Sequence, residues 1–182
     1  MSETGSGPDE MLPAPRPGLS RNEILTWLAV TDAARLERLW RAADETRRIV
    51  VGDQVALRGL IEVSNHCVRQ CGYCGLRAGN RQLERYRMTS HEILICAQKA
   101  LAYGYGTTVL QAGEDYGVTT EWLAAVVERI KAETGLAVTL SMGERPDRDL
   151  HRWREAGADR YLLRFETSDE ELYELIHPSL PG

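Results

Sequence analysis

The sequence predicts an α/β fold in which parallel strands alternate with helices, preceded by a short helical segment. Three observations carry this prediction. From residue 57 onward, short apolar stretches typical of strands alternate with stretches of helical periodicity. Glycines stand where the first three of these helices must turn back into a strand, and pairs of cap-forming residues mark two helix starts. Such alternation predicts parallel strands joined by right-handed crossovers.

The N-terminal part divides into a polar tail and two helices. Residues 1–18 are rich in Pro, Gly, Ser and Glu, a composition that buries too little apolar surface to fold, so we expect a disordered tail. Residues 19–50 repeat apolar side chains at helical spacing, and Asp32 is placed to cap the second of two helices. Residues 51–182 form the main predicted fold.

Four pairs of strand and helix follow in that main fold. The predicted strands span residues 57–64, 107–112, 137–142 and 160–166. The predicted helices span residues 89–103, 120–134, 147–156 and 168–176. Thr89 with Glu92, and Ser168 with Glu171, have the spacing of capping boxes at the first and fourth of these helices.

Four such units make up half of a (β/α)8 barrel, which needs roughly 250 residues. The chain ends soon after the fourth helix begins, and no closing strand or capping helix precedes its end. Either four units form a complete small α/β layer, or the chain is part of a longer protein. We expect the second, so the predicted fold is α/β, a partial TIM-type barrel with an N-terminal helical extension.

Composition and charge exclude several classes of protein. The 182 residues are 43% hydrophobic and 27% charged with a net charge of −5, the profile of a soluble globular protein. The acidic balance argues against a nucleic-acid partner, whose affinity would rest on Lys and Arg. No apolar run is long enough to span a bilayer, and the N-terminus lacks a targeting signal. We therefore expect a cytoplasmic protein with no membrane or nucleic-acid partner.

Three of the four cysteines, Cys67, Cys71 and Cys74, follow directly on the first predicted strand with the spacing C-x3-C-x2-C. In a reducing cytosol such a group indicates a metal or redox site rather than disulfides. Three thiolates on one loop can hold three irons of a 4Fe-4S cluster and leave the fourth iron without a protein ligand. A structural zinc site is the alternative, but it needs four ligands, and strand geometry points His66 away from Cys67. Cys96 stands apart on a helix and is expected to be a small buried hydrophobe.

Polar residues end the second to fourth predicted strands. They are Gln111, Thr139, Ser141, Arg164 and Glu166. Residues two apart on a strand share a face, and polar groups at the strand ends of a barrel are usually catalytic. We expect these side chains to face a ligand. A structural ion pair between Arg164 and Glu166 is the alternative.

Five arginines surround the cysteines, against a single acid, Glu84. They are Arg69, Arg77, Arg81, Arg85 and Arg87. They either compensate an anionic cluster and cofactor or dock an electron donor, or they belong to a solvated loop. The sequence leaves both interpretations open.

The cysteine spacing, with Tyr73 as the aromatic residue before the third cysteine, resembles the signature of the radical S-adenosylmethionine (SAM) superfamily. The fold of that family is a full or partial (β/α) barrel with the cluster loop after the first strand. In the family the unliganded iron chelates SAM, and one electron from the cluster cleaves SAM to a 5′-deoxyadenosyl radical. The resemblance implies a 4Fe-4S cluster and SAM as cofactors.

Further segments resemble HydE, the radical SAM maturase of FeFe-hydrogenase, over about residues 58–178. These segments are Ile61–Asn65, Cys74–Arg77, Arg85–Thr89, Leu110–Asp115, Ala158–Arg164 and Glu166–Thr167. Methylornithine synthase and biotin synthase are related alternatives. Biotin synthases fit less well, because Gly75–Arg77 replaces the Pro-Gln that usually follows their third cysteine. An inert cluster-binding or zinc-binding module is an alternative from another class.

The resemblance also implies roles for single residues. The segment Gln111–Glu114 takes the place of a Gly-Gly-Glu motif that contacts the methionyl amine of SAM, with Ala112 for the first glycine. The resemblance implies that Glu166 approaches the ribose and sulfonium of SAM. It also implies that Arg164 and Thr139 are catalytic and face the substrate. The implied cofactor-binding residues are Tyr73, Gln111, Gly113, Glu114, Ser141 and Glu166. The implied metal ligands are Cys67, Cys71 and Cys74.

The resemblance further implies three kinds of partner. They are a small-molecule or organometallic substrate, a one-electron donor such as ferredoxin or flavodoxin, and a hydrogenase maturation scaffold.

Overall fold

The structure is a computed structural model that describes residues 18–178 of the chain. The predicted disordered tail therefore lies outside the described residues, apart from Gly18. The chain divides after Val55 into an N-terminal helical unit and a larger α/β unit.

The N-terminal unit contains the two expected helices, α1 (Arg21–Leu28) and α2 (Ala33–Val50). The Asp32 side chain accepts a hydrogen bond from the Arg35 backbone N–H at 2.8 Å, which confirms the predicted cap of the second helix. None of the residues of these two helices is buried.

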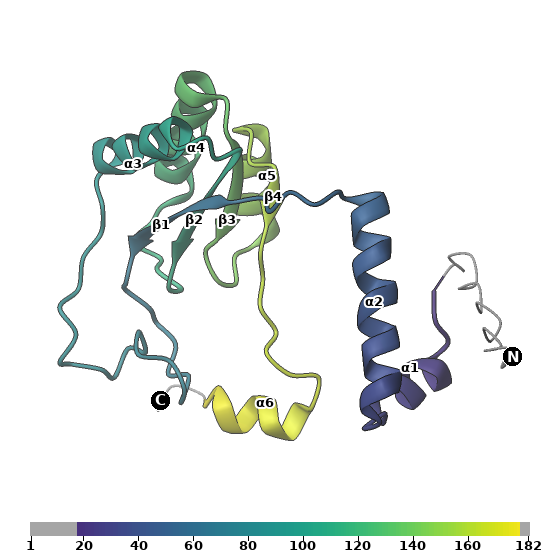
Figure 1. Cartoon of the computed structure of the whole chain (residues 1–182). Coiled ribbons are helices and arrows are strands. Elements are labelled where there is room, and N and C mark those ends of the chain that lie inside the picture. Colours follow the sequence, from purple (N-terminus) through teal and green to yellow (C-terminus); the bar gives the residue numbers. More distant parts are fainter. Residues whose placement is uncertain (1–17, 179–182) are drawn as a thin grey trace, which may run out of the picture. The chain divides into compact units, whose positions relative to one another are not determined.

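The α/β unit is built around a four-stranded parallel sheet in the order β1-β2-β3-β4 (Figure 1). The strands are β1 (Arg58–Ser64), β2 (Thr107–Ala112), β3 (Ala137–Ser141) and β4 (Arg160–Tyr161). The helices are α3 (Ser90–Ala102), α4 (Thr120–Thr134), α5 (Asp147–Glu155) and α6 (Glu170–Ile176). Because strands that are consecutive in sequence pair in parallel, the predicted alternation of strand and helix is confirmed.

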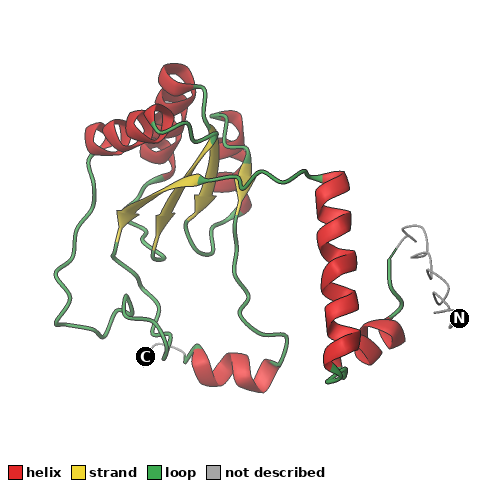
Figure 2. Ribbon diagram, in the orientation of Figure 1, coloured by secondary structure: helices red, strands yellow, loops and turns green. Residues whose placement is uncertain are grey.

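The core lies on one face of the sheet, where α3, α4 and α5 gather (Figure 2). Ile61, Leu110 and Leu140 point to these helices and are at most 5% exposed. The alternate residues point to the opposite face, where the side chain of Leu60 is 57% exposed. The unit is therefore a half-barrel in arrangement, with its helices outside and its inner face open.

Close approach between β1 and α3 depends on Gly59. A Cβ atom at this position would lie 2.7 Å from Cβ of Ala100, closer than real side chains come. Because glycine has no Cβ, the strand can lie directly against the helix.

The fourth strand is shorter than predicted. β4 contains only Arg160 and Tyr161, and one further backbone bond, from Leu162 N–H to the Leu140 carbonyl at 2.8 Å, follows it. Residues 162–166 are exposed, and no further strand of the described chain pairs with them on the other side. Glu166 has a positive φ of 61°, which ends the extended conformation. The prediction of a strand as far as residue 166 is wrong because the sheet stops at this edge.

The predicted capping box of Ser168 with Glu171 is also wrong. Asp169 caps α6 instead, and its carboxylate accepts from the Leu172 backbone N–H at 2.9 Å. A carboxylate is a stronger acceptor at a helix N-terminus than a hydroxyl, so the helix begins one residue later than expected. The box predicted at the start of α3 is confirmed, since the Glu92 carboxylate accepts from the N-cap backbone N–H at 2.7 Å.

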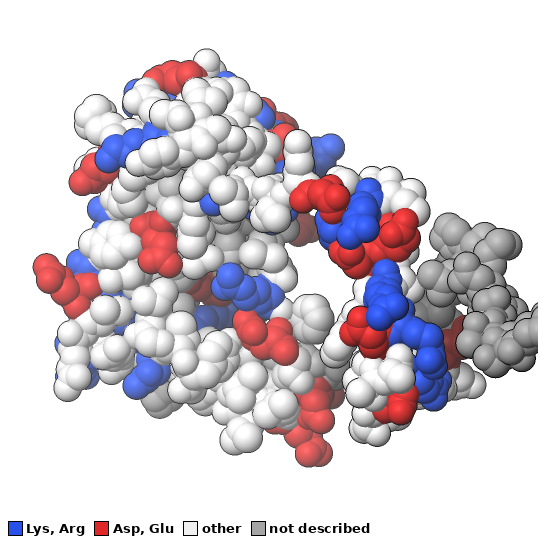
Figure 3. Space-filling model, in the orientation of Figure 1, with Lys and Arg blue, Asp and Glu red and all other residues white. Residues whose placement is uncertain are grey.

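Charges of both signs are interspersed on the face of the molecule shown in Figure 3. Within residues 18–178, no helix is both long enough and apolar enough to cross a membrane.

The one-sided core predicts unequal effects of truncating neighbouring apolar side chains. Leu110→Ala removes a fully buried side chain and should lower the free energy of unfolding by about 2–5 kcal/mol. Leu60→Ala, on the open face, should lower it by less than about 1 kcal/mol. Urea denaturation of both variants measures the difference, and equal losses would show that the open face is covered.

Candidate functional site

The three clustered cysteines lie on the loop that leaves the carboxyl end of β1. Cys67, Cys71 and Cys74 are half-buried free thiols. Sγ of Cys67 accepts hydrogen bonds from the backbone N–H groups of Arg69 and Glu114, each at 3.4 Å. Burial raises the pKa of the Cys71 thiol, and the nearby Cys67 raises it further. Within residues 18–178, no group of three or more His, Cys, Asp or Glu side chains is placed to hold a metal ion.

The end of β2 presses against this loop at Gly113. A Cβ atom on Gly113 would lie 2.7 Å from Cβ of Cys67 and even closer to the carbonyl oxygen of His66. The backbone carbonyl of the next residue, Glu114, accepts a hydrogen bond of 2.9 Å from the Val68 backbone N–H. Only glycine allows the two loops to run in contact, so this residue determines the position of Cys67.

Arg85 holds the second half of the cysteine loop in place. Its guanidinium donates to the backbone carbonyls of Asn65, Leu76 and Arg77, the last two at 2.9 and 2.8 Å. The Asn65 side chain donates to the Glu84 carbonyl and accepts from the Tyr86 N–H, both at 2.8 Å. These bonds give Arg85 a structural role.

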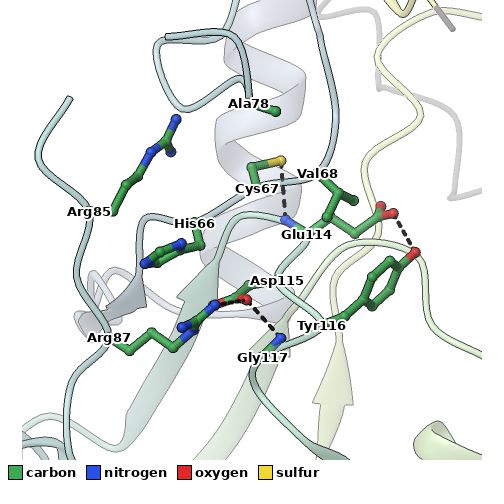
Figure 4. A pocket seen from close by; sticks show the side chains of 10 residues that line it. All are labelled: His66, Cys67, Val68, Ala78, Arg85, Arg87, Glu114, Asp115, Tyr116 and Gly117. Carbon is green, nitrogen blue, oxygen red and sulfur yellow. Dashed lines mark hydrogen bonds and ion pairs between the residues drawn. The ribbon is translucent and has the colours of Figure 1, made fainter. Parts of the chain in front are cut away.

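Arg87 and Asp115 form a paired bridge between the two loops (Figure 4). The guanidinium donates Nε–H and Nη2–H to the carboxylate at 2.7 and 2.9 Å. Asp115 is 4% exposed and also accepts from the Ser64 hydroxyl at 2.6 Å and the Gly117 N–H at 2.8 Å. Burial alone would raise the pKa of Asp115, but the bonds from Arg87, Ser64 and Gly117 lower it to about 2. The bridge therefore stays charged across the physiological range.

The carboxylate of Glu114 is 6% exposed and is already bonded to protein groups. Its Oε1 accepts from Arg69 Nε–H and from the Tyr116 hydroxyl, each at 2.9 Å, and its Oε2 accepts from the Glu144 N–H at 3.1 Å. Arg69 also donates to the Glu144 carboxylate at 2.8 Å. A carboxylate has about four acceptor positions, so protein groups occupy three of those of Glu114 and leave one on Oε2 without a protein donor.

A pocket of about 310 Å³ lies beside these groups, with Cys67, Arg87 and Asp115 in its lining (Figure 4). The ring of His66 and the thiol of Cys67 point in different directions in this view, although both residues lie beyond the end of β1. His66 is therefore poorly placed to share an ion with Cys67.

The open face of the sheet brings several predicted polar residues together. Strand register places Gln111 beside Ser141 and Glu62, while Thr139 lies one row lower on the same face. Arg164 donates to Oε1 of Gln111 at 3.3 Å, and Gln111 Nε2–H donates to Glu62 at 3.5 Å. Glu62 was not among the residues predicted from sequence. It lies on the first predicted strand, but its alignment with Gln111 requires the register.

Tyr73 contacts the end of α6. Its hydroxyl lies 3.0 Å from Nε2 of His177, and the two rings meet edge to face at 5.6 Å. The adjacent Gly72 N–H donates to the Ile176 carbonyl at 2.9 Å. The pKa of Tyr73 is raised to about 12 by partial loss of hydration, although the residue is still 57% exposed, and by the nearby Cys71. No sequence spacing could reveal this contact, because its two segments lie about a hundred residues apart.

Glu166 is exposed on the segment that leads to α6, and its charge contributes to the raised pKa of Tyr73. No ion pair joins Glu166 to Arg164 in the described part of the chain. The structure thus brings Glu166 toward the cysteine loop and Arg164 toward the open sheet face.

Comparison with known proteins identifies the class of protein that this fold and loop define. The model of the Radical SAM superfamily matches residues 61–180, and the chain belongs to that family. The [FeFe] hydrogenase maturase subunit HydE of Thermotoga maritima is 45% identical over 159 residues, which cover 87% of this chain and 45% of HydE. The 3-methylornithine synthase of Methanosarcina barkeri is 33% identical over 160 residues, which cover 87% of this chain and 45% of the synthase.

A solved structure supports the same assignment. The crystal structure of methylornithine synthase (PylB) superposes with a TM-score of 0.80 at 31% identity, covering 90% of this chain and 49% of that one. The chain spans about half the length of these relatives. The family resemblance and the partial α/β barrel predicted from sequence are confirmed.

The low pKa of Asp115 predicts a specific pH dependence of stability. Because the pKa of Asp115 is about 2 in the folded protein and ordinarily 3.8, this carboxylate contributes about 2 kcal/mol to the free energy of unfolding above about pH 4. That contribution is lost as the pH falls toward about 2. The Asp115→Asn variant should have a lower free energy of unfolding than the wild type at pH 6 and nearly the same free energy of unfolding at pH 2. Denaturant titrations at each pH measure this difference. Glu155→Gln, at an exposed acid on α5, should keep the wild-type pH dependence. Parallel curves for Asp115→Asn and wild type would contradict this assignment.

The contact at Gly113 predicts that a single methyl group disrupts the site. Gly113→Ala should lower the free energy of unfolding by about 2 kcal/mol or more, because the methyl group would overlap the loop backbone. Gly75→Ala is the matched control within the cysteine loop, since nothing lies within 4 Å of its added Cβ. Similar stability of the two variants would mean that the loops are not in contact.

Proposed function

We propose that this chain provides the cluster-binding half of a HydE-type radical SAM enzyme, with a 4Fe-4S cluster held by Cys67, Cys71 and Cys74. The observation that carries the proposal is the three-cysteine loop at the carboxyl end of β1, fixed against Gly113. When bound, the cluster would supply the electron that cleaves SAM to a 5′-deoxyadenosyl radical. We place this enzyme in the cytoplasm.

The donor set fits such a cluster in kind. The three thiols do not converge on one point, as a single metal ion would require, but each thiolate of a cluster binds a different iron. Three thiols on one short loop are the ligands that iron–sulfur clusters use, and they leave one iron open to a cofactor. Two backbone N–H groups, those of Arg69 and Glu114, already donate to Sγ of Cys67 and hold this sulfur in place. A structural zinc site is less well supported, because His66 points away from Cys67 and Cys96 lies on α3.

The surrounding residues support the roles that the resemblance implies. Gly113 allows the backbone of the β2 loop to lie beside the cysteines, and Glu114 has one acceptor position for the amine of SAM. The remaining proposed cofactor contacts are Tyr73, Gln111, Ser141 and Glu166. Thr139 and Arg164, on the open face, would bind the substrate. In a complete barrel this face would form the inner wall, where strand-end residues act.

The particular reaction proposed is that of HydE, because identity to HydE is 45% and identity to the methylornithine synthase is 33%. The substrate would be a small organometallic precursor, the electron would come from a carrier such as ferredoxin or flavodoxin, and the product would pass to a maturation scaffold. A methylornithine synthase-like or biotin synthase-like reaction is the second candidate, supported by their 28–33% identity.

The cluster assignment predicts that three of the four cysteines are needed to bind iron and sulfide and that the fourth is not. Anaerobic reconstitution of the chain should give a brown protein with about four iron and four sulfide per chain. Cys67→Ala, Cys71→Ala and Cys74→Ala should each lose most of the iron and sulfide. Cys96→Ala should keep both, since Cys96 packs against the core on α3. Stoichiometric zinc without sulfide would contradict the proposal.

A further inference from the structure

The cysteine loop is basic in a chain that is acidic as a whole. The chain carries a net charge of −5, yet residues 65–88 contain five arginines and one acid, Glu84. The structure divides the five arginines into two groups. Three of them are held by protein acceptors: Arg69 by two carboxylates, Arg87 by a third carboxylate and Arg85 by backbone carbonyls.

The other two, Arg77 and Arg81, are exposed. Within the described chain, Arg81 has no hydrogen-bond or ion-pair partner. Arg77 donates to the backbone carbonyl of Cys74 at 3.1 Å and forms no ion pair in that part of the chain. Two guanidinium groups therefore keep their charge available to a partner.

The turn that presents these arginines is well ordered by hydrogen bonds. Asn80 N–H donates to the Arg77 carbonyl at 3.0 Å, and the Asn80 side chain donates to the Gly75 carbonyl at 2.9 Å. Arg85 binds the carbonyls of Leu76 and Arg77 from within. A surface held in this way needs little ordering when a partner binds, which favours recognition.

We propose that Arg77 and Arg81 form the docking surface for an acidic one-electron carrier protein. The inference rests on the proposed function, since it requires a cluster on Cys67, Cys71 and Cys74. One electron would leave the carrier and reduce the cluster by one charge unit, with no bond made or broken.

The location of Arg77 favours an electron carrier over other acidic partners. The Arg77 guanidinium donates to the backbone carbonyl of Cys74, which is a proposed cluster ligand. A partner carboxylate that paired with Arg77 would therefore lie close to the cluster. Two arginines also suit a small patch of carboxylates, while a nucleic acid would need a longer basic track and would be repelled by the acidic remainder. Glu84 is the one acid of residues 65–88 and does not outweigh the five arginines, so the surface stays positively charged.

The test uses the anaerobically reconstituted chain and flavodoxin hydroquinone as the probe. The double variant Arg77→Glu with Arg81→Glu should reduce the second-order rate of cluster reduction about tenfold or more at low ionic strength. Titration with oxidised flavodoxin should show a similar rise in Kd. Both differences should shrink as salt is added, because the attraction is screened. The conservative variant Arg77→Lys with Arg81→Lys should retain most of the wild-type rate.

Two controls separate docking from damage. Arg148→Glu with Arg154→Glu makes the same charge change at two exposed arginines of α5 and should leave flavodoxin binding within about twofold. Reduction by methyl viologen radical cation, together with iron and sulfide content, reports whether the cluster itself is intact. Equal flavodoxin rates and Kd values for wild type and the Arg77/Arg81 double variant would overturn the docking surface. Absence of a cluster in the wild type would instead contradict the proposed function, and the Kd comparison would still decide on the surface.

Discussion

The contact between the loops that follow β1 and β2 determines the geometry of the whole site. Gly113 lies against His66 and Cys67 with no room for a Cβ atom, so the cysteine loop must pass over the end of β2. The bridge between the exposed Arg87 and the buried Asp115 then fixes the two loops to each other. Because these bonds involve a buried carboxylate, loss of either partner would leave an unpaired group and release the loop.

The sheet supplies the second part of the proposed site, a face that would bind cofactor and substrate. Its helix-facing side holds the buried core, and its other side presents Gln111, Thr139 and Ser141 in register. The relatives are about twice as long as this chain, so in them further chain is available to enclose the corresponding face. The half described here holds the proposed cluster ligands and one wall of the proposed cavity. Closing that cavity would exclude water from the radical intermediate.

The sequence was informative where local chemistry decides the structure. Caps at Asp32 and Thr89 and the alternation of strands and helices follow from short-range patterns, and the structure confirms them. Long-range neighbours decide the rest. The fourth strand ends at Tyr161 because no further strand within residues 18–178 pairs with it, which no local pattern can report. The alignment of Glu62 with Gln111 depends on register, and the division of the arginines depends on which acceptors the fold brings to each.

Electron–nuclear double resonance can show whether the proposed cluster has three cysteine ligands and one iron that binds SAM. The measurement is made on the reduced, reconstituted chain mixed with SAM carrying ¹⁵N in its amino group. A hyperfine coupling between the label and the cluster, absent from the Cys67→Ala variant, is the predicted result. A wild-type cluster with no coupling to the label would contradict the account, because the open iron would then not bind SAM.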